Sequence, residues 1–268
     1  MKNPVQMAQL TADAMRKVVQ RQPVILLPLG SFEDQGPHMP MGDYLLADIM
    51  AQHIATAATE QGYETYTAPV LPFGGADYFG YMPGGIALSQ TTLRAVLQDM
   101  LTSLIKHGFK KLVIINGHSG NCSMIHDVTQ ALFQHNKTMV PSFYLWRAAA
   151  ALLPDIVGVE QAKRSGGHGA NPLTSIGQYL VPELVKAENM IIPDQTKKVW
   201  GLDVLDFGTV SLHGVPISVP LEGDKTATQG VGRGDPHFCN AETGKALTEK
   251  LVQTGVALIA HMNTQPSV

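Results

Sequence analysis

The chain has few of the residues on which several classes of protein depend. Its 268 residues include only two cysteines, Cys122 and Cys239, which lie far apart and lack C-x-x-C spacing. This argues against a disulfide-stapled scaffold and against a cysteine zinc clip, so two free buried thiols are expected. Charged residues make up only 15% of the chain, and the formal net charge of -3 leaves no basic stripe for nucleic acid.

Long apolar runs and punctuated linkers are missing as well. No run is long enough to cross a bilayer, and the start of the chain, residues 1–4, lacks the positively charged region and long apolar stretch of a secretory signal. A cytoplasmic protein with no membrane contact is therefore expected. No Ser/Pro-rich linker, charge run or internal repeat divides the chain, and 44% of it is hydrophobic. We expect a single domain over residues 1–268.

Apolar runs alternate with helical stretches along the chain. Strands are predicted at residues 24–29, 63–70, 111–115 and 139–145. Helices are predicted at residues 43–60, 90–106, 121–135, 171–180 and 241–262. This order predicts an α/β fold of three layers, α/β/α, with a mostly parallel central sheet. The glycine-rich residues 194–234 have no helical period and are expected to form strands and loops that close over a site or make a subunit contact.

Side chains that can bind a metal follow two of the predicted strands. Glu33 and Asp43 come after the first strand, in a segment whose glycines and prolines turn the chain back over the strand end, and His118 follows the strand at 111–115. Open α/β sheets bind their ligands at the carboxyl ends of the strands. Glu33 alone would be an ordinary surface or capping carboxylate; the three together predict a metal site. Asp43 also falls at a helix N-terminus, whose N–H groups should lower its proton affinity.

The order of motifs resembles that of the creatininase family of metal-dependent amidohydrolases. That family carries G-S-x-E-Q-H-G-P-H-L-P, then N-G-H-x-x-N, then H-A-G-x-x-E-T-S. Here residues 30–40 read G-S-F-E-D-Q-G-P-H-M-P, residues 116–121 read N-G-H-S-G-N, and residues 168–175 read H-G-A-N-P-L-T-S. Further family-like stretches occur at 79–88 and 230–236. The matches run in the family's order over nearly the whole chain and imply its fold.

The resemblance also implies which residues bind metal. Family members usually hold two ions bridged by the Asp, and one of them is also bound by the first Glu and the N-G-H histidine. These ligands correspond to Glu33, Asp43 and His118. A divalent ion, zinc or manganese, suits this mixed set of nitrogen and oxygen ligands.

Three residues depart from the family's motifs. Gln35 stands where the family has a histidine ligand, Leu173 stands where it has a glutamate, and Gly120 stands where creatininase itself has a carboxylate. An amide is a poor replacement for imidazole at a transition metal. We therefore expect one ion per chain.

His168 matches the histidine of the third motif and is the predicted general acid/base, because imidazole moves protons near neutral pH. Alternatively, His168 is an incidental residue of a flexible glycine loop. Gln35 and His38 are predicted to support the site by hydrogen bonds, and His38 would otherwise only stabilise its loop. Asn171 is predicted either to bind a substrate carbonyl or to cap a helix, and Trp146 either to wall the pocket or to lie in the core.

The functional hypothesis is a metal-dependent hydrolase that cleaves a non-peptide C–N bond in a small, possibly cyclic, amide. The rival is a non-catalytic protein of this fold that binds a ligand or one structural metal. The resemblance also implies a homo-oligomer, because creatininase forms hexamers, and the partners expected are therefore a small amide and further copies of the chain.

Overall fold

The computed structural model describes residues 4–264, and its centre is a parallel four-stranded sheet in the order β2-β1-β3-β4. The strands are β1 (Val24–Leu29), β2 (Thr65–Thr67), β3 (Lys111–Asn116) and β4 (Ser142–Tyr144). All six residues of β1 are buried. This explains its uninterrupted apolar sequence, since both faces of such a strand are covered.

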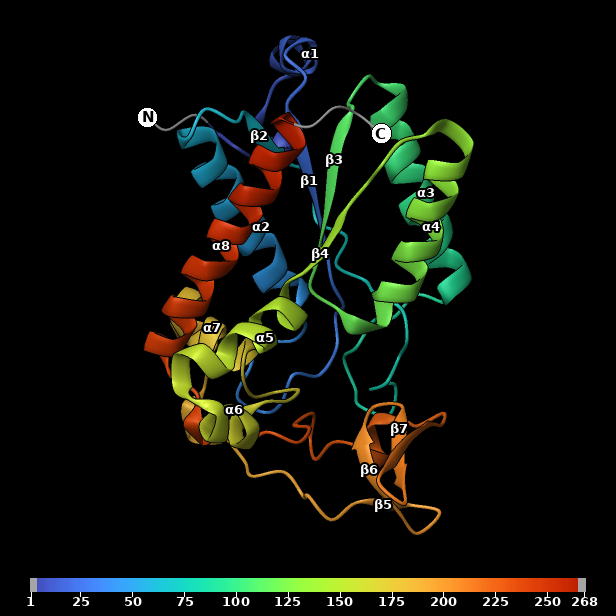
Figure 1. The fold of residues 1–268 in the computed structure, drawn as a ribbon, viewed down its shortest axis with the longest axis vertical. Coiled ribbons are helices and arrows are strands. Elements are labelled where there is room, and N and C mark those ends of the chain that lie inside the picture. Colours follow the sequence, from blue (N-terminus) through green and yellow to red (C-terminus); the bar gives the residue numbers. More distant parts are fainter. Residues whose placement is uncertain (1–3, 265–268) are drawn as a thin grey trace.

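Helices cover both faces of this sheet (Figure 1). One face carries α2 (Tyr44–Glu60) and α8 (Ala241–Thr264), and the other carries α3 (Gln90–Lys106) and α4 (Cys122–Asn136). Successive β1 side chains divide between two cores, with Leu26 packing among residues of α2 and α8 and Leu27 among residues of α3 and α4. The predicted three-layer α/β/α class is confirmed.

Several helices were not predicted from the sequence. These are α1 (Ala12–Gln20), α5 (Leu145–Val157) and α6 (Val159–Ser165). The strand predicted at 139–145 is shortened to β4, because the chain passes directly into α5 at Leu145. The strand predicted at 63–70 is likewise shortened to β2, and the helix predicted at 171–180 begins later, as α7 (Leu173–Leu180). Short 3-10 helices occur at Met7–Gln9, Ser119–Asn121, Pro182–Leu184, Ala187–Asn189, Gly223–Lys225 and Pro236–Phe238.

Residues 194–234 contain a second, antiparallel sheet in the order β5-β6-β7-β8. Its strands are β5 (Lys198–Val199), β6 (Leu202–Asp206), β7 (Thr209–Leu212) and β8 (Val215–Ser218). It lies beyond the carboxyl ends of the parallel strands (Figure 1). Phe207, in its β6–β7 turn, packs edge-on against His168 with ring centroids 5.3 Å apart. This contact packs the small sheet against the loop that carries His168.

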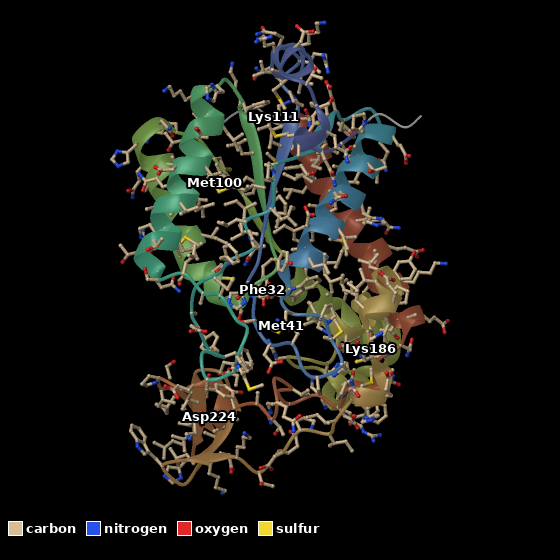
Figure 2. All side chains as sticks on the ribbon, turned by 180° about the vertical axis from the view of Figure 1, so that it is seen from behind. Phe32, Met41, Met100, Lys111, Lys186 and Asp224 are labelled. Carbon is tan, nitrogen blue, oxygen red and sulfur yellow. The ribbon has the colours of Figure 1, made fainter. Side chains whose placement is uncertain are left out.

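The direction of the parallel strands can be followed in Figure 2. Lys111 begins β3 at one end of the sheet, whereas Phe32, just past the end of β1, lies toward the other end, on the side of the small sheet. The segments that follow β1 and β3 therefore emerge at the same edge. Within residues 4–264, the helices are too short or too polar to span a bilayer.

Candidate metal centre

Two carboxylates are fixed by the tight fold of the chain after β1. Asp43 precedes α2, and its Oδ1 accepts a hydrogen bond from the Ser31 backbone N–H at 2.7 Å. A Cβ at Gly30 would lie 2.5 Å from that same Oδ1 and 2.5 Å from the Tyr44 Cα. Position 30 must therefore be glycine for β1 to end this close to the start of α2. Glu33 lies in the intervening loop, and both acids are buried, at 6% and 4% exposure.

His118 reaches the same point from the end of β3. Its Nδ1 lies 3.2 Å from Glu33 Oε1 and 3.1 Å from Asp43 Oδ2, and its Nε2 lies 3.0 Å from the Gly75 carbonyl oxygen. A carbonyl can only accept, so Nε2 carries a proton and Nδ1 faces the carboxylates. Asn116 holds the turn by accepting from the His118 N–H and donating to the His118 carbonyl. Fixing one ring nitrogen in this way is how proteins present the other to a metal.

The three side chains form a compact donor set. Their ligand atoms all lie within 4.8 Å of one another, and all three residues are buried. Two carboxylates and an imidazole suit zinc or manganese, and the double negative charge matches a divalent cation. The residues predicted to bind metal are thus brought together and fit a divalent ion.

Burial and mutual charge shift the proton affinities of these groups. Burial raises the pKa of Glu33, but the charges and hydrogen bonds of His118 and His168 outweigh it and bring that pKa down to about 2. Burial raises the pKa of Asp43 to about 6, although His118 opposes the shift. For His118 burial lowers the pKa, but the two carboxylates outweigh it and raise the pKa well above 6.5.

The expectation that the helix N-terminus would lower the proton affinity of Asp43 is wrong. Its side chain makes no capping hydrogen bond to α2, and complete burial dominates its pKa.

His168 approaches Glu33 from the loop before α7. Its Nε2 lies 3.3 Å from Glu33 Oε1, and its Nδ1 lies 2.7 Å from the Gly230 carbonyl oxygen. Because a carbonyl oxygen only accepts, the Gly230 contact requires a proton on His168 Nδ1. The other ring nitrogen, Nε2, then faces Glu33 in the candidate metal centre. The ring stacks on Phe79 at 4.7 Å and meets Phe207 edge-on. His168 is therefore held in a single orientation at the edge of the metal centre.

Three residues depart from the family pattern. Gln35 is buried and its amide donates to Glu33 Oε1 at 3.2 Å, so it supports a carboxylate. Leu173 lines the cavity with an apolar side chain. A Cβ at Gly120 would lie 2.6 Å from His118 Nε2 and 2.8 Å from the Gly75 oxygen. No side chain can enter from position 120 without displacing its neighbours.

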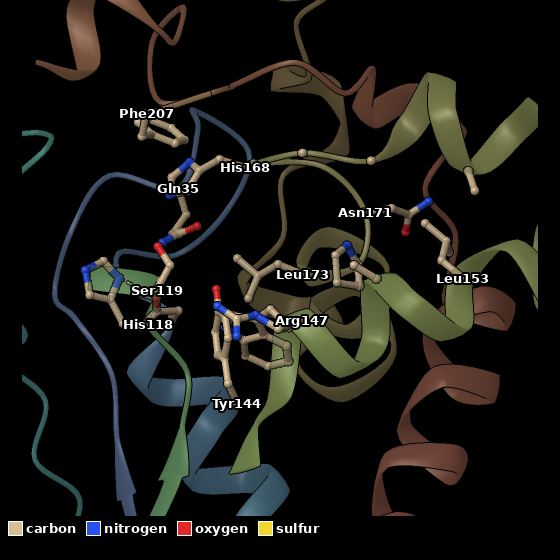
Figure 3. A pocket seen from close by; sticks show the side chains of 18 of the residues that line it. Gln35, His118, Ser119, Tyr144, Arg147, Leu153, His168, Asn171, Leu173 and Phe207 are labelled. Atoms are coloured by element: carbon tan, nitrogen blue, oxygen red, sulfur yellow. Dashed lines mark hydrogen bonds and ion pairs between the residues drawn. The ribbon is translucent and has the colours of Figure 1, made fainter. Parts of the chain in front are cut away.

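A cavity of about 600 Å³ opens over these residues (Figure 3). Trp146 lines it and is 8% exposed, so it both walls the pocket and belongs to the core. Asn171 also lines it, but its amide donates to Ser165 Oγ at 3.0 Å and accepts from Ser175 Oγ at 2.5 Å. The cap of α7 is Pro172 rather than Asn171. The Asn171 amide is thus engaged within the protein.

His38 lies outside the cavity lining, at 1% exposure, with Nε2 3.1 Å from Thr174 Oγ1. This contact ties its loop to α7 and matches the loop-stabilising alternative.

Sequence reasoning did not single out four further residues of the cavity: Phe79, Tyr144, Arg147 and Phe207. Tyr144 ends β4 at the edge that carries His118, so its position after a parallel strand was a usable signal. Phe207 comes from the antiparallel sheet, and nothing local in the sequence marks it.

The family model for creatininase, described as creatinine amidohydrolase, matches residues 8–259. The chain belongs to the creatininase family. Creatinine amidohydrolase of Pseudomonas putida is 27% identical over 180 residues, which is 63% of this chain and 68% of that protein. The mycofactocin precursor peptide peptidase of Mycobacterium ulcerans is 24% identical over 249 residues, which is 91% of this chain and 87% of that protein.

Solved creatininase structures share the fold. A crystal structure of creatinine amidohydrolase superposes with a TM-score of 0.79 at 22% identity, covering 99% of this chain and 100% of that one. A putative creatinine amidohydrolase from Bacteroides fragilis also gives 0.79, at 23% identity, over 100% of both chains. Other similar structures are described as a mutant creatininase of the Zn-Zn type and as creatininase Mn. The chain therefore has the creatininase fold and a candidate site for zinc or manganese.

Proposed function

We propose that this creatininase-family protein is a metal-dependent amidohydrolase that cleaves a non-peptide C–N bond in a small amide. The observation that carries the proposal is a shared contact at Glu33. Its Oε1 lies 3.2 Å from His118 Nδ1, in the donor set, and 3.3 Å from His168 Nε2, a histidine outside that set. Metal ligands and a separate proton carrier thus converge at one end of a cavity of ligand size.

A divalent ion held by Glu33, Asp43 and His118 supplies a Lewis acid for a carbonyl oxygen and lowers the pKa of a bound water. The chain's own contribution is to move the proton. With Nδ1–H bonded to the Gly230 carbonyl, His168 presents Nε2 to accept a proton and to pass it to a leaving nitrogen. The Glu33 carboxylate 3.3 Å away stabilises the imidazolium formed in between.

The surroundings of His168 favour this role. Phe79 and Phe207 pack on its ring from two directions, which limits rotation and keeps water off the imidazole. The side chain nevertheless keeps 17% exposure and faces the cavity, so a substrate can reach it.

The relatives differ in substrate, since one is named for creatinine and another for a precursor peptide. A linear small amide, a cyclic one and a peptide bond all place a carbonyl and a leaving nitrogen at the metal. The proposal favours a non-peptide amide because the cavity of about 600 Å³ has the size of a small-ligand site.

The second candidate is a non-catalytic metal-binding protein, favoured by Gln35, Leu173 and Gly120, the three residues that depart from the family's motifs. The test is hydrolysis by zinc- and manganese-loaded protein of a panel containing creatinine, linear amides and short peptides, with the His168→Gln variant beside it. Turnover of a non-peptide amide that depends on metal and on His168 is expected. Metal binding without turnover of any member would support the non-catalytic candidate, and turnover of peptides alone would replace the non-peptide substrate.

A further inference from the structure

The cavity continues well past the metal centre, and its far part is apolar. Helices α5 and α6 supply this wall through five residues, which are Ala150, Leu153, Pro154, Val159 and Ala162. Figure 3 shows Leu153 and Asn171 at the end of the pocket opposite His118 and Ser119. Val159 is 56% exposed although its side chain is wholly apolar. A wall of this kind binds hydrocarbon rather than a polar heterocycle.

One cation lies between the two ends of the cavity. Arg147 lines the pocket beside Tyr144, with its guanidinium 5.4 Å from the Tyr144 ring centroid (Figure 3). Arg147 is exposed, and among the residues the structure describes it packs on the Tyr144 ring without a hydrogen bond or an ion pair. Lys163, the other cation of the lining, is already paired with Glu160 at 3.1 Å. Arg147 is thus a positioned positive charge without a negative partner.

The charges of the cavity determine what that partner is. The acids of its lining are Glu33 and Asp43, which a divalent ion neutralises. With Lys163 compensated by Glu160, the loaded cavity keeps the single positive charge of Arg147. A guanidinium binds carboxylate or phosphate in preference to neutral groups.

We propose that the substrate of this cavity is an amide bearing an apolar segment and an anionic group, which Arg147 binds while α5 and α6 cover the apolar segment. The inference rests on the proposed hydrolase function and adds a substrate class to it. Arg147 acts as a specificity-determining residue, and it takes no part in proton transfer. A peptide with a free carboxyl terminus and apolar side chains offers the same chemistry, so the test includes one.

The probes separate charge from length. Suberic acid mono-p-nitroanilide has an apolar segment and a carboxylate, octanoic p-nitroanilide has the segment alone, and succinic mono-p-nitroanilide has the carboxylate on a short segment. Hydrolysis of each is followed by release of nitroaniline. Binding is followed independently in the Trp200→Phe background, because Trp200 is 82% exposed and its removal leaves Trp146, which lines the pocket, as the sole tryptophan.

The suberic probe is expected to have the highest kcat/KM and the tightest binding of the three. Arg147→Gln should reduce both by about twofold to fivefold for that probe, the upper part of the range for a solvent-accessible charge pair, and leave the octanoic probe unchanged. Arg147→Lys should keep most of the preference. Lys245→Gln removes an exposed charge from α8 and is the matched control, expected to have no effect.

Equal affinity for the charged and uncharged long probes, or an unchanged preference in Arg147→Gln, would overturn the inference. If no amide is cleaved but Trp146 reports Arg147-dependent binding, the substrate class holds and the hydrolase proposal fails. If amides are cleaved without a preference for the charged probe, the hydrolase proposal holds and the substrate class fails. Preference for N-acetyl-Ala-Leu-Phe over its carboxamide, with no binding of the suberic probe, would assign the anion to a peptide terminus. A light-scattering mass that falls when the suberic probe binds would assign the apolar wall to a second copy and overturn the proposal.

Discussion

Gly120 offers the most direct test of how the metal centre is built, through the substitution Gly120→Ala. The backbone at this position does not have a positive φ, so alanine introduces no backbone strain. The new Cβ would lie 2.6 Å from His118 Nε2, 2.7 Å from the Ala76 Cβ and 2.8 Å from the Gly75 carbonyl oxygen. All three distances are shorter than ordinary contacts, so either the His118 ring or the Gly75 segment must move.

The expected magnitudes follow from what is displaced. Overpacking a buried site costs about 1–3 kcal/mol of unfolding free energy. In a protein of this size each kcal/mol lowers Tm by about 2–4 °C. The displaced hydrogen bond from His118 Nε2 to the Gly75 carbonyl is the one that fixes the imidazole, and losing such a supporting contact weakens metal binding by about tenfold to a hundredfold. The loss of metal affinity should therefore be larger than the loss of unfolding free energy alone would predict.

The assay pairs thermal unfolding followed by circular dichroism with zinc competition against a chromophoric chelator. Gly85→Ala is the matched control, because Gly85 also lacks a positive φ and its added Cβ would meet nothing closer than 3.4 Å. It should leave Tm and zinc affinity unchanged. Wild-type zinc affinity in Gly120→Ala, with Tm lowered or not, would show that the packing of His118 against position 120 does not hold the ligand in place.

Further predictions concern the ligands, the protons, the ion count and assembly. His118→Ala should abolish metal binding, whereas His168→Ala should keep its metal and lose about a hundredfold to ten-thousandfold in turnover; metal-free His168→Ala protein by elemental analysis would make that residue a ligand. Because the pKa of Asp43 is raised to about 6 and that of His118 stands above its usual value, protons occupy the donor set at low pH. Zinc affinity should then fall as pH drops through about 6, and calorimetry in two buffers near neutral pH should detect proton release on binding; an affinity independent of pH would contradict these shifts. Protein purified without chelator should contain one divalent ion per chain, and two would show that Gln35 or another residue completes a second site. Light scattering should give a multiple of 28.8 kDa, and the mass of one chain would refute the oligomer.

The layers of the fold were predictable because burial leaves a direct trace in sequence. β1 and β3 read as unbroken apolar runs, and both are buried on two covered faces. Helix α5 was missed although its buried Leu145, Ala149 and Leu153 recur at helical spacing, because a strand was extended into its first residue. Periodicity alone does not show where a short apolar strand ends and an apolar helix begins.

The candidate metal ligands were predictable for a topological reason. Parallel strands end at one edge, so the residues after β1 and β3 had to meet, and Glu33 and His118 do. The proton affinity of Asp43 was not predictable, since it depends on complete burial rather than on the helix that follows. Arg147 and Phe207 were out of reach because their places in the cavity depend on a helix that was missed and on a hairpin packed from a distant part of the chain.

The departures from the family pattern are informative because they agree with one another. Gln35, Leu173 and Gly120 lie in three separate segments, and the resemblance places a family histidine ligand at the first, a family glutamate at the second and a carboxylate of creatininase itself at the third. Gln35 donates to Glu33, Leu173 presents hydrocarbon to the cavity, and Gly120 packs against His118. The candidate centre thus keeps Glu33, Asp43 and His118 as donors for one ion, while Leu173 lines the adjoining cavity with hydrocarbon.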